Sequence, residues 1–314
     1  MDGIASDSAP HADSEMVAGE GPELSVVIAC DGSASGLLAA LTAIAASCTQ
    51  LSAEIIVVHD SMTTVPHPSD LPLPIRFVAV NSPLVPVLWG HGIREARGRT
   101  VALTTTQFRV DAGWSRQLLH GLQQTGCSGI GGRMALDPSA SMLSRALFLL
   151  RYSEHIGTAV DQPVREIAGD NAAYRRADIE LVAPVLGSGF WEVDVHRLLR
   201  ARGRCISRAP HAVALFASSL TLGAILANRF EHGSHYGRFR VHHLQWPRWK
   251  AVAVAPAVPV VLLWRILRRV HQARRLDARD VLCLPLMMLM LVAWAAGECR
   301  GALRSPSPSA GVSR

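Results

Sequence analysis

The sequence predicts an α/β protein with a mostly parallel, doubly wound sheet, followed by an apolar helical pair at the C-terminus. Three observations support this fold class. Short apolar and β-branched runs alternate with helical segments from residue 24 onward, which is the βαβ rhythm of a parallel sheet. These short runs are almost continuously apolar, as is typical of strands buried on both faces. Two longer apolar runs, separated by arginines, lie near the C-terminus.

Each element of the main domain is predicted from a local pattern. Buried strands are expected over 24–30, 54–58, 75–80 and 100–104, with a short strand over 205–207. Helices are expected over 39–46, 86–97, 114–124, 141–152 and 193–201. The prolines, serines and threonines of residues 60–74 predict a loop. Because such sheets bind ligands at the carboxyl ends of their strands, the residues after each strand are the first candidates for a site.

Charge divides the chain into segments. The 314 residues are 49% hydrophobic and 18% charged, which excludes disorder throughout, collagen and a disulfide miniprotein. Residues 1–24 carry six acids and no Lys or Arg, whereas residues 229–279 carry eleven Lys or Arg and two acids. The basic stretch predicts an anionic partner, such as an anionic membrane surface. We expect a disordered acidic tail (1–22), a main domain (23–218), a basic interfacial helix or linker (219–250), a membrane-associated helical pair (251–304) and a second disordered tail (305–314).

The C-terminal apolar runs, 251–264 and 281–296, are 14 and 16 residues long, whereas a bilayer-spanning helix needs about 20 residues. Six arginines lie between the two runs. A spanning hairpin would place these arginines opposite the main domain, against the positive-inside tendency. We therefore favour a re-entrant or interfacial pair on the cytoplasmic face of the cell membrane, where the arginines meet anionic lipid. A spanning hairpin and a soluble hairpin or homodimer interface are the alternatives.

The six cysteines have no metal-ligand spacing, and the N-terminus lacks a basic start followed by an apolar run. We therefore expect no signal peptide, and buried, reduced thiols in the cytoplasm. No nucleic acid is expected as a partner, because the basic stretch lies beside apolar segments and carries no helix-turn-helix or RNA-binding signature.

Six motifs between residues 24 and 216 resemble, in order, those of family 2 glycosyltransferases. Ser25-Val-Val-Ile-Ala29 and Glu54-Ile-Ile-Val-Val-His-Asp-Ser-Met-Thr63 are similar to the family's S-V-V-I-P and E-I-I-V-V-D-D-G-S-T. Gly92-Ile-Arg-Glu-Ala-Arg-Gly98 is similar to its N-x-G-x-x-x-A-x-G helix, and Gly113-Trp114 to its P-G-W. Two more motifs belong to the second half: Gly169-Asp-Asn-Ala-Ala-Tyr-Arg-Arg176 is similar to the G-x-N-x-A-F-R-R loop, and Trp191–Arg200, with Gly203 and Pro210, to the E-D-x-D ending.

The resemblance implies an A-type glycosyltransferase fold over 23–218, with the nucleotide-sugar half first and the acceptor half second. It implies inverting transfer of a sugar from a nucleotide-sugar to a lipid-linked or polysaccharide acceptor, in envelope or exopolysaccharide synthesis. Asp60 matches the acid that accepts hydrogen bonds from the base or ribose; a cap for the following turn is its alternative role. The residues matched to donor binding are Ala29, Asp31, Asp60, Thr105 and Gln107.

The D-x-D motif of the family falls on Thr105 and Gln107, where this sequence departs from the pattern. A Mg²⁺ or Mn²⁺ ion that bridges a diphosphate prefers anionic oxygen ligands, and Thr and Gln offer only neutral ones. The sequence therefore assigns no metal ligand and leaves the cofactor open. Either cations such as Arg109 or Arg133 replace the metal, or the activity is lost.

Glu192 stands where the family places its catalytic base. Inverting transfer needs a carboxylate that takes the proton from the attacking hydroxyl. The alternative is that Glu192 only favours the N-terminus of the next helix through the helix dipole. The resemblance places Asn171, Arg175 and Trp191 on the acceptor side.

The rival to an active membrane-associated glycosyltransferase is an inactive glycosyltransferase-like module that binds a partner or a sugar at the membrane. Two further patterns are interpreted in structural terms. The segment Gln245-Trp-Pro-Arg-Trp249 matches the Q-x-x-R-W of processive synthases, but we interpret its tryptophans as an interfacial belt. The histidines at 232, 235, 242 and 243 are interpreted as part of a basic helix that touches lipid phosphates or a diphosphate, in preference to a zinc site.

Overall fold

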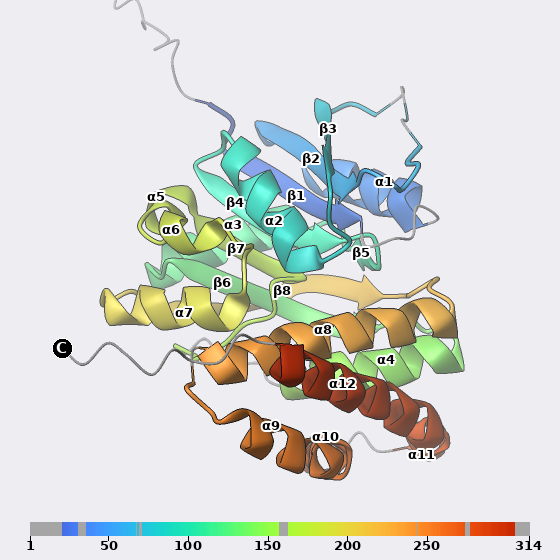
Figure 1. Cartoon of the computed structure of the whole chain (residues 1–314). Helices are drawn as coiled ribbons and strands as arrows, with labels where there is room; N and C mark the ends of the chain where they lie inside the picture. The colour runs from blue at the N-terminus through green and yellow to red at the C-terminus, as the bar shows by residue number, and fades with distance from the viewer. Residues whose placement is uncertain are drawn as a thin grey trace, which may run out of the picture.

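A mixed eight-stranded sheet forms the centre of the part of the chain that the structure describes (Figure 1). The structure is a computed structural model, and it describes residues 21–30, 36–66, 68, 71–156, 163–242, 244–273 and 277–304. The strands are β1 (Leu24–Cys30), β2 (Ala53–Asp60), β3 (Ile75–Val80), β4 (Thr100–Thr105), β5 (Phe108–Val110), β6 (Gly129–Leu136), β7 (Asn171–Arg175) and β8 (Ile206–Phe216).

The strands lie in the order β3-β2-β1-β4-β7-β6-β8-β5. Four of the neighbouring pairs are parallel: β2 with β3, β1 with β2, β1 with β4, and β6 with β8. The pairs β4 with β7, β6 with β7, and β5 with β8 are antiparallel. The sheet curls, so that β5 packs against helix α1 (Leu37–Ser47) although it is the last strand in the order. A mostly parallel α/β sheet, as the sequence predicts, is confirmed.

Helices cover both faces of the sheet and enclose two hydrophobic cores. One core packs α1, α3 (Trp114–Thr125) and α4 (Met142–Tyr152) against one face. The other core packs α2 (Val85–Glu95), α5 (Arg176–Glu180), α6 (Ala183–Leu186) and α7 (Glu192–Ala201) against the opposite face. A short 3-10 turn, η2 (Ser153–His155), follows α4. Both faces of β1 are therefore buried, which explains its continuous apolar run.

The strands predicted over 24–30 and 75–80 are confirmed at the predicted residues, and those over 54–58 and 100–104 are confirmed with longer bounds. The short strand expected over 205–207 is much longer, because β8 reaches Phe216. The prediction of a loop over 169–176 is wrong, since residues 171–175 form β7 between β4 and β6. Strands β5 and β6 were not expected from the sequence pattern.

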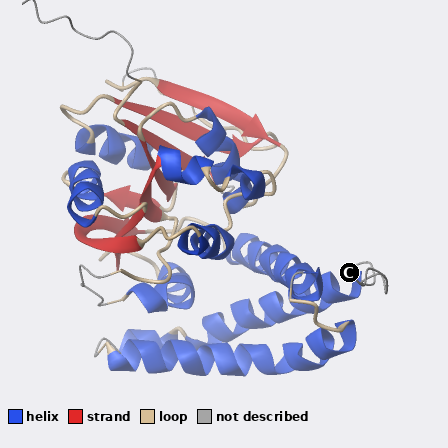
Figure 2. Ribbon diagram, turned by 90° about the vertical axis from the view of Figure 1, so that its left-hand side faces the viewer, coloured by secondary structure: helices blue, strands red, loops and turns tan. Residues whose placement is uncertain are grey.

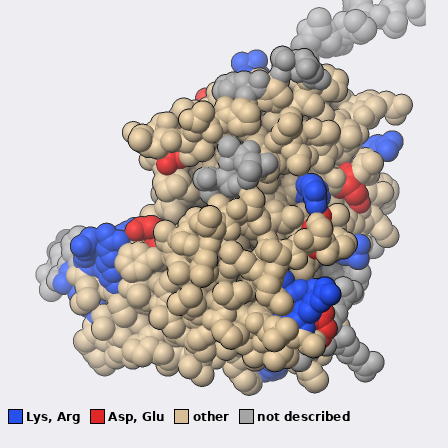
Figure 3. All heavy atoms as spheres, turned by 90° about the vertical axis from the view of Figure 1, so that its right-hand side faces the viewer, with Lys and Arg blue, Asp and Glu red and all other residues tan. Residues whose placement is uncertain are grey.

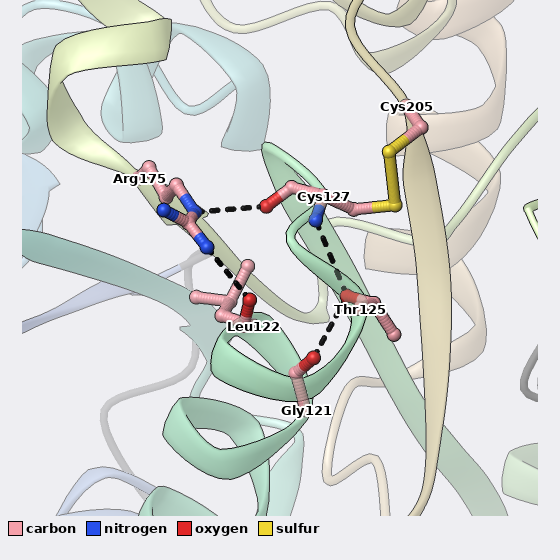
Figure 4. The surroundings of a disulfide bond; sticks show 6 residues. All are labelled: Gly121, Leu122, Thr125, Cys127, Arg175 and Cys205. Atoms are coloured by element: carbon pink, nitrogen blue, oxygen red, sulfur yellow. Dashed lines mark hydrogen bonds between the residues drawn. A yellow bond between two sulfur atoms is a disulfide. The ribbon is translucent and has the colours of Figure 1, made fainter.

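Two of the six cysteines, Cys127 and Cys205, form a disulfide with 4.9 Å between their Cα atoms (Figure 4). The expectation of six reduced thiols is therefore wrong. Cys127 lies two residues before β6 and Cys205 one residue before β8, and the two strands pair in parallel from Gly129 and Ile206. Because the cysteines are 78 residues apart, only this pairing brings them together. The thiols consequently give no support for a reducing compartment.

A layer of C-terminal helices packs below the sheet domain (Figure 2). These helices are α8 (Leu222–His242), α9 (Arg248–Val254), η3 (Ala255–Ala257), α10 (Val258–Gln272), α11 (Ala278–Leu282) and α12 (Leu284–Arg304). Within the described residues, two stretches are long and apolar enough to cross a membrane: Arg248–Gln272, with mean hydropathy 1.8, and Leu284–Arg304, with mean hydropathy 1.4. The apolar helical pair predicted from the sequence is therefore present, and both helices are longer than the apolar runs suggested.

Helices α8 and α12 run in the same direction and touch through their backbones. Each helix carries a G-x-x-x-G pair, at residues 233 and 237 in α8 and at residues 297 and 301 in α12. A Cβ atom added to any of these four glycines would overlap a carbonyl oxygen of the opposite helix. Glycine is therefore required for this close approach, because any side chain would separate the helices.

The segment between the two apolar helices is tied to the sheet domain. Arg145 of α4 forms ion pairs with Asp280 at 2.7 Å and with Asp277 at 3.2 Å. Arg269 of α10 pairs with Glu154 of η2. Met287 and Met290 of α12 belong to the same core as the helices of the sheet domain. The turn between the helices thus lies on the sheet domain itself.

Candidate functional site

The candidate site lies at the carboxyl edge of β4, where β7 begins. Thr104 near the end of β4 pairs with Asn171 at the start of the antiparallel β7. Gly169 and Asp170, which precede β7, therefore lie beside the carboxyl end of a parallel strand. Trp89 of α2 reinforces this junction, because its Nε1 donates a hydrogen bond to the Thr104 carbonyl at 2.9 Å. This is the edge at which doubly wound sheets bind ligands.

Glu192, the predicted base, is brought to this edge. It is the first residue of α7, and its Oε1 accepts a hydrogen bond from the backbone N–H of Gly169 at 3.0 Å. Burial, and next the negative charge of Asp170, raise the pKa of Glu192 to about 7. The carboxylate is therefore the stronger base that proton abstraction requires at neutral pH. Its place at the helix N-terminus, the alternative role, is also observed, but the helix dipole does not keep its pKa low.

A buried group of charges adjoins Glu192. One nitrogen of Arg151 contacts both carboxylate oxygens of Asp170, at 3.0 and 3.1 Å, and only 3% of Asp170 is exposed. Arg229 of α8 is also buried, and burial together with the charge of Arg151 lowers its pKa to about 9. Among the described residues Arg229 has no ion-pair partner of its own. Two guanidinium groups and one carboxylate therefore lie together beside the candidate base, and Arg151 forms the ion pair with Asp170.

A cavity of about 510 Å³ opens beside Glu192, between the start of α7 and helices α8 and α12. Cavities of this size are typical of small-molecule sites. Its lining residues are Ser188, Trp191, Glu192, Val193, Asp194, His232, His235, Tyr236, Arg238, Phe239, His242 and Trp294. The cavity thus joins the predicted base to the C-terminal helices, which the sequence analysis had treated as a separate membrane-associated part.

Of the predicted acceptor residues, only Trp191 lies in the cavity. Asn171 is fully buried: its Oδ1 accepts from Trp114 Nε1 at 2.7 Å, and its Nδ2 donates to the carbonyls of Arg133 and Ala212 at 3.0 and 3.2 Å. An amide with these three partners holds β7 against its neighbours, and its complete burial keeps it away from a ligand. The expectation of an acceptor contact through Asn171 is therefore corrected.

The expectation that Arg175 lies on the acceptor side is corrected for a different reason. It pairs with Thr100 at the start of β4, so it lies at the edge of the sheet opposite to the site. Its guanidinium donates to the carbonyls of Cys127 and Leu122, at 3.0 and 2.8 Å (Figure 4). Arg175 therefore holds the end of α3 and the loop after it, away from any ligand at the carboxyl edge.

The predicted donor residues are placed at the carboxyl ends of β1, β2 and β4. Asp60 is half-buried at the end of β2, and its Oδ1 accepts from the Met62 N–H at 3.4 Å, so the turn-capping role is present. The carbonyl of Ala29 accepts from the Thr106 N–H at 3.3 Å. Thr105 and Gln107 are buried. Asp31 lies outside the described residues.

The described residues contain no group of three or more His, Cys, Asp or Glu side chains that could hold a metal ion. The positions of the family's metal ligands carry Thr105 and Gln107, which supply neutral oxygen at best. Arg109, one cation proposed to replace the metal, is paired with Asp137. Arg133, the other, is exposed and lies on β6.

Sequence reasoning missed Asp170, Arg151 and Arg229 as parts of the site. Asp170 stands inside a recognised motif, yet nothing in its spacing identifies Arg151 as its partner. His232 and His235 were noted as members of a basic stretch, but their place on a cavity wall depends on how α8 packs.

The chain matches no known protein family and no curated protein.

Proposed function

We propose that the protein is a membrane-associated inverting glycosyltransferase that moves a sugar from a nucleotide-sugar donor to a lipid-linked or glycan acceptor. The observation that carries this proposal is the position of Glu192. Its carboxylate has a raised pKa, lies at the carboxyl edge of β4 and faces a cavity large enough for a substrate. The resemblance of six ordered motifs to family 2 glycosyltransferases, together with the mostly parallel α/β sheet, supports the same function.

The reaction needs one proton acceptor and one leaving group. Glu192 takes the proton of the acceptor hydroxyl while the hydroxyl oxygen attacks the anomeric carbon from the face opposite the nucleotide. The bond between the anomeric carbon and the diphosphate oxygen breaks, and the nucleoside diphosphate leaves with the electron pair. The new glycosidic bond has inverted configuration, and the proton remains on Glu192.

Two cationic side chains belong to the group of charges beside the candidate base. Arg151 and Arg229 together carry one positive charge more than Asp170 neutralises. A cation held in a partly buried site stabilises developing negative charge strongly, because the local dielectric is low. This arrangement supports transfer without the carboxylate pair of a D-x-D motif, while Asp60 stands at the edge where the nucleotide would lie.

The C-terminal helices support an interfacial position at the membrane. Exposed apolar side chains gather on them, among them Trp249, Val260, Val261 and Trp264. Figure 3 shows that the lower part of the molecule is a broad surface with few charged side chains, bordered by Lys and Arg. Because the turn between the two helices is tied to Arg145 of α4, this end of the pair stays with the sheet domain. We therefore place the protein on the cytoplasmic face of the cell membrane, with the helices lying in the interface.

An inactive glycosyltransferase-like module is the second candidate function. The neutral side chains of Thr105 and Gln107 at the metal-ligand positions favour it. The decisive experiment is to incubate the full chain, in lipid nanodiscs, with a set of UDP-, GDP- and TDP-sugars, with and without Mn²⁺. Release of nucleoside diphosphate from any donor, lost in Glu192→Gln when acceptor lipid is present, supports the transferase. No release from any donor, with or without metal, supports the inactive module.

A further inference from the structure

One face of α8 forms a wall of the cavity at Glu192. The residues of α8 that line it include His232, His235, Tyr236 and Phe239, spaced at i, i+3, i+4 and i+7. This spacing places all four side chains on one side of a helix. His232 and His235, which the sequence predicts on a basic helix that touches lipid phosphates or a diphosphate, therefore line the cavity.

Aromatic rings from three segments meet on this wall. The ring of Trp191, next to Glu192, contacts the imidazoles of His232 and His235, with centroids 6.2 and 5.4 Å apart. The ring of Trp294, from α12, contacts Tyr236 at 5.8 Å. Large rings with an apolar face and a polar edge give flat surfaces on which a ligand's C–H groups can pack.

The polar groups of the cavity suit hydroxyls better than an anion. Burial, reinforced by Arg229, Arg151 and His235, lowers the pKa of His232 well below its usual value. Burial and Arg238 also lower the pKa of His235, although Glu231 acts in the opposite direction. A neutral imidazole offers one donor and one acceptor, which is the pair of functions that a hydroxyl group complements.

The charged side chains that line the cavity also favour a neutral ligand with hydroxyl groups over an anion. Glu192 and Asp194 are acids, and Arg238 is the one Lys or Arg among the lining residues that the structure describes. Asp194 contacts Arg197 at 3.3 Å, and Arg238 donates to the Ser234 hydroxyl at 3.4 Å. A phosphate would be repelled by two carboxylates and attracted by only one guanidinium. A neutral polyol carries no charge and is not repelled.

We propose that this cavity binds a sugar ring of the acceptor, packed against Trp191 and Trp294 and hydrogen-bonded by His232 and His235, with one hydroxyl directed to Glu192. The role of Glu192 in this statement rests on the proposed function, whereas sugar binding does not. The acceptor is thus recognised through its carbohydrate. That carbohydrate has two sources, a lipid-linked saccharide and a free glycan, and the test separates them.

The test is saturation-transfer NMR on the full chain in nanodiscs. The probes are methyl glycosides of glucose, galactose, mannose, rhamnose and N-acetylglucosamine, and the corresponding octyl glycosides below their micellar concentration. We expect saturation of the ring protons of at least one sugar, with affinity reduced at least fivefold in Trp294→Leu and in His235→Ala. The amide variant His235→Gln keeps a donor and an acceptor and should retain most of the binding. His120→Ala, which removes an exposed histidine of α3, is the matched control.

Equal binding of methyl and octyl glycosides identifies a free glycan as the source, and binding of octyl glycosides alone identifies a lipid-linked saccharide. The inference is overturned if no probe is saturated, if Trp294→Leu and His235→Ala both bind normally while folded, or if inorganic diphosphate displaces the sugar from wild-type protein. Donor hydrolysis is measured on the same samples. Hydrolysis without sugar binding rejects this inference alone, whereas sugar binding without hydrolysis or transfer from any donor rejects the proposed function alone.

Discussion

The backbone N–H of Gly169 donates a hydrogen bond to the carboxylate of Glu192 across 23 residues of sequence, at 3.0 Å. This contact fixes the first residue of α7 to the strand junction at the carboxyl edge of β4. It holds the carboxylate at the wall of the cavity. A side chain at position 169 would meet the ring of Trp89 and the Glu192 carboxylate, so glycine is needed for this close approach.

Replacing Glu192 by Gln keeps the shape of the side chain and removes the proton acceptor. We expect turnover to fall by about 10²–10⁴-fold, the usual size of a general-base contribution. Donor binding should change by no more than about twofold, because the base faces the acceptor cavity. Steady-state kinetics and calorimetry with the donor measure the two quantities. Glu180→Gln, which alters an exposed glutamate of α5, is the control. Near-normal turnover in Glu192→Gln would exclude the base role.

The rate should depend on pH through the same carboxylate. A base acts only when deprotonated, so with a pKa of about 7 for Glu192 the rate should rise about tenfold per pH unit below pH 7 and level off above pH 8. Asp170 raises this pKa by its negative charge. Asp170→Asn should therefore shift the acidic limb to lower pH. If the acidic limb of folded Asp170→Asn did not shift, the charge of Asp170 would not act on the pKa of Glu192. Because the variant also removes the ion pair between Asp170 and the partly buried Arg151, a thermal melt must accompany the profile.

Asp60 is tested on the donor side. Asp60→Ala should weaken binding of the nucleoside diphosphate by about 1.5–3 kcal/mol, the scale of a hydrogen bond to a charged group. The Met62 N–H is the one hydrogen-bond partner that the structure gives to the Asp60 carboxylate, at 3.4 Å, so the fold should tolerate the change. Isothermal calorimetry with UDP and GDP measures the loss. Unchanged affinity would assign Asp60 to the turn alone.

The crossing of α8 and α12 predicts a pair of opposite glycine effects. Gly237→Ala places a Cβ against the Glu298 carbonyl, and should lower the free energy of unfolding by about 1–3 kcal/mol, as overpacking does. Gly223→Ala in the same helix meets no atom within 4 Å, so it should raise stability by up to about 1 kcal/mol through helix propensity. Chemical denaturation in detergent compares them. Equal effects of the two substitutions would contradict a backbone contact between the helices.

Membrane association is tested on α10. Val261→Asp combined with Trp264→Asp places two charges on an exposed apolar face, and should reduce binding to anionic vesicles at least tenfold. Leu38→Asp changes an equally exposed apolar residue on α1 and should have no such effect. Co-sedimentation with phosphatidylglycerol vesicles measures both. Undiminished pelleting of the folded double variant would remove α10 from the membrane contact.

The elements that the sequence predicted well are those in which successive residues are buried in the same way. Residues 24–30 are buried on both faces of the sheet, so every position is apolar or small. Strand β6 was missed because its first half is Gly129-Ile-Gly-Gly132, which has three glycines and a single β-branched residue. A Cβ at Gly132 would overlap Asn171 and the Ala212 carbonyl. The glycines therefore serve contacts with other strands, which a local pattern does not reveal.

The site was predictable only where one motif carries it. Glu192 and Trp191 stand together in sequence, and the structure keeps both at the cavity. Asn171 and Arg175 share a motif with Asp170, but this motif forms the extended strand β7. Asn171 is buried in the core, and Arg175 lies at the opposite edge of the sheet. Arg151, Arg229 and Trp294 come from three distant helices, and only their packing assembles them around the base.

The backbone contact between α8 and α12 joins two helices with different surroundings into one unit. Trp294 and the exposed Leu289 and Val292 belong to α12, while His232 and His235 belong to α8. Because the backbones touch at the four glycines of this crossing, a displacement of α12 would be transmitted directly to α8. The cavity wall would then turn relative to Glu192. The geometry of the cavity is therefore coupled to the position of α12.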